Sequence, residues 1–428
     1  MSRVAPAVAM VLLLLALATV IGVATPWRAL PAASGRPVAA APDRDFTPAE
    51  RAREDRFHRA VRPPGYTSLL VGLAVAALLA LTPLGAGVVT GAARPFGGGW
   101  VAQVLAGGLA LLLIGRIAVL PFDARVETVL RRAGLSTQTW ASWLADVGKG
   151  FAVSSVLTLV GLVGLVGLAR AWPHRWWIPA AAIAAALVFV VSFAAPVVVE
   201  PLFNRFTSMP AGPLRDSLLD LAREDGVRVD EVLVADASRR TTALNAYVSG
   251  FGATKRIVVY DTLLRSAGPE EVRLVVAHEL GHAKRRDVLR ASVIGALAAA
   301  IVVCLLFVLL GPGAGDPRLL PRVLLLISVV GLVAAPVGTL VSRRVEAFAD
   351  VHSLDLTRDP ATFVASERRL ALRNLSDLDP SPLVYAMFAT HPSAPQRIAL
   401  ARTWARVHGV PEPPSAVAPS VRPPVSHR

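Results

Sequence analysis

The chain has 428 residues, of which 54% are hydrophobic, and its mean hydropathy is +0.55. This composition excludes an ordinary soluble protein of this length and indicates a membrane protein. The formal net charge of +14 at pH 7 comes almost wholly from arginines, and these gather in alternate loops between apolar segments. That distribution is typical of membrane topology, so we expect no nucleic-acid partner.

Seven apolar segments are long enough to cross a lipid bilayer as helices. They cover about residues 7–25, 68–89, 100–120, 151–169, 177–198, 291–310 and 323–341. The first segment has an alternative interpretation as a cleaved signal peptide, because it follows Arg3 and ends in small residues near Ala24. Its single charge and its long apolar run favour a membrane helix.

The arginines also predict the orientation of these helices. They are frequent in three long loops, residues 26–67, 121–150 and 199–290, and sparse in the short loops between them. Under the positive-inside rule the long loops and the carboxyl terminus face the cytoplasm, and the amino terminus lies outside. The sequence therefore predicts a multi-pass protein of the inner (plasma) membrane.

The soluble block of domain-like size spans residues 201–290 and is completed by residues 342–410. It contains an amphipathic helix over residues 213–224 and a second helix that opens at Pro269. Three extended runs, at residues 231–235, 244–248 and 256–260, predict a small antiparallel sheet. We therefore divide the chain into five amino-terminal spans (1–200), a second domain that contains both the soluble block and the last two spans (201–410), and a disordered proline-rich tail (411–428).

The most informative motif is His278-Glu279-Leu280-Gly281-His282. Its two histidines are one helical turn apart, so they share a face and can bind one cation, and Glu279 can reach a water molecule beside that cation. The chain has a single cysteine, Cys304, which lies inside an apolar segment. A zinc ion would therefore need nitrogen and oxygen ligands.

Glu346 is the predicted third ligand. The sixth apolar segment crosses the bilayer outward and the seventh returns, so the residues after Val341 emerge beside the motif helix. If the last helix continues, Glu346 and Asp350 share one face. The alternative is a solvated face whose acids balance Arg343 and Arg344.

Two carboxylates compete to orient a ligand histidine by accepting its second N–H. Asp350 can do so or can share a proton with the substrate, and Asp287 follows His282 by five residues. An interfacial ion pair of Asp287 with Arg286 or Arg290 is equally compatible with the sequence. Inside the third apolar segment, Arg116 must face a partner or a wet interior, or extend to the membrane surface.

Together, the motif at 278–282, the pattern Ser342-Arg343-x-x-Glu346-x-x-Ala349-Asp350 and the seven spans resemble the Ste24-type CAAX prenyl proteases of peptidase family M48. Further matches lie at residues 201–204, 244–247, 256–264 and 390–393, with Arg397-Ile398 beyond them. The resemblance implies a mainly α membrane protein. Its seven helices would surround a chamber, with a zincin-like α+β catalytic domain on the cytoplasmic side.

The resemblance also implies roles for individual residues. His278, His282 and Glu346 match the ligands of one Zn²⁺ ion per chain, Glu279 matches the general base, and Asp350 matches a proposed proton donor. His391, in a Thr-His-Pro-Ser turn, is the expected donor to the oxyanion, with a surface or capping role as its alternative.

Two further residues are assigned with alternatives left open. Asn245 is expected to hydrogen-bond the substrate backbone at the edge of the sheet, unless it is an ordinary strand residue. Arg397 either holds a substrate carboxylate or pairs with a structural acid, and the second is favoured.

The leading hypothesis is a membrane zinc metalloendopeptidase that acts on peptides or membrane-protein tails. One alternative is a quality-control protease of the HtpX type, which has fewer membrane spans by the same resemblance. The other is a non-catalytic scaffold stabilised by zinc, which is disfavoured because a closed structural site has no use for Glu279.

Overall fold

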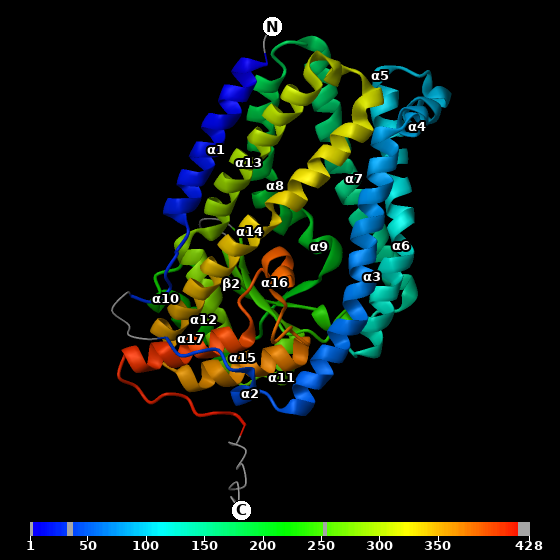
Figure 1. Ribbon diagram of the computed structural model, residues 1–428. Coiled ribbons are helices and arrows are strands. Elements are labelled where there is room, and N and C mark those ends of the chain that lie inside the picture. Colours follow the sequence, from blue (N-terminus) through cyan, green and yellow to red (C-terminus); the bar gives the residue numbers. More distant parts are fainter. Residues whose placement is uncertain (1–2, 32–36, 251–254, 418–428) are drawn as a thin grey trace, which may run out of the picture.

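The computed structural model describes residues 3–31, 37–250 and 255–417. Long helices fill the upper part of the molecule in Figure 1, and a small sheet with shorter helices lies below them. The first helix, α1 (Val4–Ala24), begins at the upper end, whereas α17 (Ala394–Val407) lies near the lower end. The mainly helical membrane fold with a small sheet agrees with the sequence prediction.

Seven helices in the described part of the chain are long and apolar enough to cross a membrane, which confirms the predicted number. They are α1, α3 (Pro48–Leu81), the segment Trp100–Arg132, α7 (Trp140–Ala171), α8 (Trp177–Val198), α13 (Asp287–Leu310) and α14 (Leu320–Thr357). Within the third of them, α5 (Trp100–Ala102), a π-helical turn η2 (Gln103–Gly107) and α6 (Gly108–Arg132) follow one another. Several of these helices extend beyond their apolar segments into polar sequence.

The predicted end of the second span was wrong. Helix α3 ends at Leu81, and a separate helix, α4 (Pro83–Ala93), begins after Thr82, whose hydroxyl accepts the N–H of Leu84. Proline at the first position of a helix favours such a new start. At its other end, α3 begins at Pro48 within the predicted loop, where Thr47 and Glu50 form a capping box.

Shorter helices surround the sheet and connect the membrane helices. The α-helices among them are α2 (Pro42–Asp45), α9 (Glu200–Phe203), α10 (Pro213–Glu224), α11 (Asp261–Ser266), α12 (Pro269–Arg285), α15 (Pro360–Asn374) and α16 (Pro382–Phe388). Short 3-10 turns are η1 (Arg94–Phe96), η3 (Ala237–Arg239), η5 (Gly311–Gly315) and η6 (Pro317–Leu319).

The sheet has four strands in the order β1-β2-β4-β3. They are β1 (Phe206–Ser208), β2 (Glu231–Ala235), β3 (Ala246–Ser249) and β4 (Arg256–Tyr260). The prediction of a wholly antiparallel sheet was wrong, because β2 and β4 are parallel neighbours. The 20 residues between them leave room for the crossover that parallel strands need, and β3 lies within that connection. β3 is the last strand in this order, and so it lies at an edge of the sheet.

Two buried clusters hold the lower part of the protein together. In the first, α10 and α12 pack on the sheet through residues that include Leu218, Ile257 and Leu280. The second cluster joins the segment before α3 to α14, α15 and α17, with Phe46, Leu354, Phe363 and Trp404 among its members. Helix α12 contributes to both clusters, with Leu280 in the first and Leu274 in the second, and it packs against α14.

The contacts of two arginines, Arg402 and Arg116, correct or complete the sequence prediction. Residues 411–417 were predicted to be disordered, but the carbonyls of Pro413 and Pro414 accept hydrogen bonds from the buried Arg402. The rest of the predicted tail, 418–428, lies outside the described residues. Within the membrane, Arg116 pairs with Asp123 at 2.7 Å, and so it has a protein partner.

Candidate metal centre

Helix α12 carries the His-Glu-x-x-His motif. It begins at Pro269, and the N–H of Gly268 donates to Glu271, while Arg286 ends it with a left-handed φ of 58°. The side chains of Val272 and Leu280 are buried in the sheet core. Because apolar residues occupy that face, both histidines are directed towards α14.

Gly281 allows α12 and α14 to approach closely. A Cβ atom at this position would lie 3.0 Å from the ring of His352 on α14, so a larger residue would push the two helices apart. Helix α14 runs without a break from the membrane-spanning segment to Thr357 and carries Glu346 and Asp350 next to the motif. The predicted continuation of the last membrane helix is therefore confirmed.

The three predicted ligand residues lie together. Oε2 of Glu346 is 3.2 Å from Nε2 of His278, and Oε1 is 3.6 Å from Nε2 of His282. The two Nε2 atoms are 3.2 Å apart. One ligand atom from each of the three residues lies within 4.8 Å of the others, which is a spacing that a single metal ion can bridge.

The donor set fits such an ion. Both imidazoles use Nδ1 for hydrogen bonds to carboxylates, so both Nε2 atoms point towards Glu346. Oε2 of Glu346 is buried and has no well-formed hydrogen bond. Two imidazole nitrogens and one carboxylate are ligands that zinc and related divalent ions accept.

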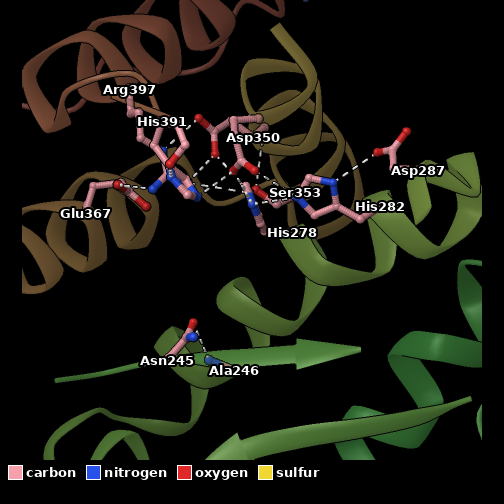
Figure 2. Close-up of polar contacts among 12 residues, drawn as sticks. Asn245, Ala246, His278, His282, Asp287, Asp350, Ser353, Glu367, His391 and Arg397 are labelled. Atoms are coloured by element: carbon pink, nitrogen blue, oxygen red, sulfur yellow. Dashed lines mark hydrogen bonds and ion pairs between the residues drawn. The ribbon is translucent and has the colours of Figure 1, made fainter. Parts of the chain in front are cut away.

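Each histidine has its own orienting carboxylate (Figure 2). Oδ1 of Asp350 lies 2.9 Å from Nδ1 of His278, and Oδ2 of Asp287 lies 3.0 Å from Nδ1 of His282. The two acids expected to compete for one role therefore serve one histidine each. Such contacts fix the tautomer and the direction of a ligand imidazole.

A largely buried arginine continues the chain of contacts behind His278. Nε of Arg397 donates to Oδ2 of Asp350 at 2.9 Å, and a terminal nitrogen lies 2.7 Å from Glu367 on α15 (Figure 2). Arg397 thus pairs with acids, as the favoured interpretation expected. Glu367 was missed, because its sequence position is that of an ordinary acid on an amphipathic helix. Burial raises the pKa of Glu367 to about 7, against the opposing charge of Arg397.

Without a metal ion the site attracts protons. Burial disfavours the charged imidazole of His278, but contacts with Asp350 and Glu346 outweigh burial and raise its pKa to about 10. The same balance, with Asp287 and Glu346 as partners, raises the pKa of His282 to about 9. A cation in this position would replace those protons.

A cavity of about 1090 Å³ opens beside the histidines. His278, Glu279, Asn245 and His391 all contribute to its wall. Much of the remaining wall is apolar and comes from α3 and α16, with Val61, Tyr66, Leu69, Val384 and Phe388. Burial raises the pKa of Glu279, as expected for a carboxylate beside such a wall. The cavity is large enough for an extended peptide segment with bulky apolar side chains.

His391 reaches the metal centre from the segment after α16. Its Nε2 lies 3.3 Å from Oε2 of Glu346, and its side chain is exposed to the cavity. Arg343 holds this segment, because its guanidinium donates to the carbonyls of Tyr385 and Ala389 at 2.7 Å each. The sequence placed Arg343 in a family pattern and offered it as a charge balanced by nearby acids. It gave no sign of this role, since the acceptors are more than 40 residues away in the chain.

Asn245 immediately precedes the edge strand β3 and lies on the cavity wall. Its Oδ1 accepts the N–H of Ala246 at 3.0 Å (Figure 2). Both the edge position of β3 and the location of Asn245 agree with a strand that an extended peptide can join.

Comparisons with known proteins identify this combination of fold and site. A family model described as peptidase family M48 matches residues 208–405. A model described as CAAX prenyl protease N-terminal, five membrane helices, matches residues 66–205. Together with the histidine and glutamate cluster, these matches define a membrane metalloprotease.

A Bacillus subtilis protein named uncharacterized metalloprotease YhfN is 32% identical over 300 residues, which cover 67% of this chain and 70% of that protein. The chain therefore belongs to peptidase family M48.

More distant relatives share parts of the chain. CAAX prenyl protease 1 of Saccharomyces cerevisiae is 36% identical over 123 residues, which cover 28% of this chain and 27% of that protein. The crystal structure of Ste24p from S. mikatae superposes with a TM-score of 0.72 and 19% identity, covering 92% of this chain and 98% of that chain. This match supports the fold over nearly the whole length.

Proposed function

We propose that this protein is a zinc metalloendopeptidase that hydrolyses peptide bonds in peptides or in the cytoplasmic tails of membrane proteins. One observation carries the proposal. Nε2 of His278 and His282 and the carboxylate of Glu346 converge beside a cavity whose wall includes Glu279. A metal ion and a general base are thereby available to the same substrate.

In this proposal His278, His282 and Glu346 hold one Zn²⁺ ion. The ion would supply Lewis acidity and lower the pKa of a water molecule from 15.7 towards about 7. Glu279 accepts a proton from the water that attacks the scissile carbonyl and passes it to the leaving amine. Its raised pKa suits a group that must both take and return a proton.

The other residues bind and position. His391 donates to the oxyanion that forms on the scissile carbonyl, since its ring is exposed to the cavity beside Glu346. The edge of β3 and Asn245 bind the substrate backbone. We assign Asp350 to orienting His278 rather than to proton donation, because it is fully buried and both its oxygens are engaged.

The arginine distribution supports a cytoplasmic site and an external amino terminus in the inner (plasma) membrane. The match to a five-helix amino-terminal model favours a CAAX-protease-like enzyme over the HtpX-type alternative. The location of Glu279 on the cavity wall disfavours a non-catalytic scaffold.

Substitution Glu279→Gln tests the proposal. We expect zinc content to stay at one ion per chain by elemental analysis, while peptide cleavage falls by about 10²–10⁴-fold. Glu270→Gln, at a 73% exposed side chain on the same helix, is the matched control and should keep full activity. Undiminished proteolysis in a zinc-loaded Glu279→Gln protein would contradict the proposal. Comparing prenylated with unprenylated peptides would then define the substrate.

A further inference from the structure

Arg285, the last residue of α12, contacts the carboxylate that orients His282. Its Nε donates to Oδ1 of Asp287 at 3.0 Å. The other oxygen of Asp287 lies 3.0 Å from Nδ1 of His282. Arg285 and Asp287 are both 14% exposed, so water competes little for either contact. The direction of the His282 ring therefore depends on a carboxylate that Arg285 fixes.

The same guanidinium reaches the first membrane helix. A terminal nitrogen of Arg285 donates to the carbonyl of Ala24, the last residue of α1, at 2.9 Å. Carbonyls in the last turn of a helix lack an intrahelical partner and carry partial negative charge, so an arginine is a favourable donor there. α1 also runs along α13, whose first residue is Asp287 (Figure 1).

A third contact fixes the guanidinium from the side of α14. Its central carbon lies 4.7 Å from the ring centroid of Phe348, which is two residues from both Glu346 and Asp350. A planar guanidinium can donate along two edges and stack on a ring at the same time, whereas an ammonium group cannot. Arg285 thus joins α1, α14 and the start of α13 at one point.

We propose that Arg285 is a positioning residue for the metal centre, and that through it the inner end of α1 keeps His282 in its metal-binding orientation. This inference rests on the proposed metal-dependent function. α1 is apolar along almost its entire length, so the bilayer alone does not fix its depth or rotation. Its contact with Arg285 and its packing along α13 do so, which makes the inner end of α1 a support of the metal centre.

The first test is the zinc affinity of the purified full-length protein, measured by competition with a chelator. Substitution Arg285→Met should weaken zinc binding by about tenfold, at the lower end of the range for partners of metal ligands. The peptide KM should stay unchanged, because Arg285 does not touch the cavity residues that bind substrate. Arg290→Met is the matched control and should change zinc affinity by less than about twofold. Arg290 is 42% exposed and lies 3.9 Å from the same carboxylate.

A double-mutant comparison shows whether Arg285 acts through Asp287. Substitution Asp287→Asn should weaken zinc binding at least as much as Arg285→Met. The combined variant should bind zinc no more weakly than Asp287→Asn alone, because one chain of contacts is broken in each case. Losses that multiply would show that the two residues act independently, and would overturn the proposal.

A backbone change tests the role of α1. Thr25 has a φ of −81°, which proline accepts, but a proline there disfavours the helical conformation of Ala24 and turns its carbonyl away. Thr25→Pro should therefore weaken zinc binding as Arg285→Met does, with no further loss in the combined variant. Thr25→Ala, which keeps the backbone free, is its control.

Two results separate this inference from the proposed function. If the parent protein binds zinc tightly and Arg285→Met binds it equally well, only the positioning role is lost. If the parent protein binds no zinc, the proposed function itself fails. Thermal unfolding of each variant with excess zinc shows whether it is folded, and Arg285→Met with Arg290→Met decides the matter even if Thr25→Pro does not fold.

Discussion

The carboxylate of Asp350 lies 2.9 Å from Nδ1 of His278, and this contact turns the opposite ring nitrogen towards Glu346. The carboxylate is fully buried, and its second oxygen is held by Arg397. Asp350 is therefore placed to orient a ligand and to keep its tautomer, which is the usual task of a carboxylate behind a metal-binding histidine.

Substitution Asp350→Asn should weaken zinc binding by about 10–100-fold, because the amide loses the charge that fixes the imidazole. At saturating zinc, kcat should recover most of its parent value. Chelator competition and peptide cleavage at increasing zinc concentrations measure the two effects. A large loss of kcat that persists at full zinc occupancy would instead indicate that Asp350 takes part in proton transfer.

The stabilisation that zinc gives should grow as the pH rises. In the metal-free protein the pKa values of His278 and His282 are raised from 6.5 to about 10 and about 9, by contacts with Asp350, Asp287 and Glu346 that outweigh burial. Their contribution to stability is fully present below pH 6.5 and is lost as the pH rises through 9 to 10. Zinc replaces these protons, so the increase in Tm on adding zinc should be larger at pH 8.5 than at pH 6.5. An increase in Tm that does not change with pH would contradict this account of the site.

The three predicted ligand residues could be found from the sequence because two of them belong to a motif and the topology of the chain constrains the third. His278 and His282 are a helical turn apart, and a returning membrane helix had to bring Glu346 beside them. The roles of Arg285 and Arg343 were not found, because the contacts that tie them to α1 and to the segment before His391 go to the carbonyls of Ala24 and of residues 385 and 389, distant in sequence. Backbone acceptors leave no residue pattern to recognise.

The fold, like the site, was predictable from the sequence only in part. Apolar length predicted seven membrane helices, since crossing a bilayer needs about 20 apolar residues. The pairing of β2 with β4 was not predictable from alternation, which is the same for parallel and antiparallel neighbours. The break after Leu81 was signalled by Pro83, but continuous hydropathy across residues 68–89 concealed it.

Arg343 should control the position of His391 without affecting zinc. Its guanidinium holds the carbonyls of Tyr385 and Ala389, on either side of the end of α16, and also stacks on the ring of Tyr385. We expect Arg343→Met to lower kcat about as much as His391→Ala, with zinc affinity unchanged. The double variant should be no worse than His391→Ala alone. A loss of zinc affinity in Arg343→Met would show that it acts on Glu346 instead.

The buried pair of Arg402 and Asp45 should be the most sensitive ionic contact between the amino-terminal segment and the lower domain. One guanidinium nitrogen lies 2.7 Å from Asp45, and both side chains are at most 2% exposed. Arg402→Met leaves an unpaired buried carboxylate and should cost about 3–5 kcal/mol, or roughly 3–6 °C in Tm for a chain of this length. Arg406→Met is the control. It removes the ion pair of Arg406, whose side chain is 53% exposed, with Glu412, and should cost about 0–1 kcal/mol.

Replacing Asp45 by Asn in the Arg402→Met protein should restore part of the lost stability, because the unpaired charge is then removed. Thermal unfolding of the purified variants gives all three values, and equal Tm values for the Arg402 and Arg406 variants would show that the segment is not held by this pair.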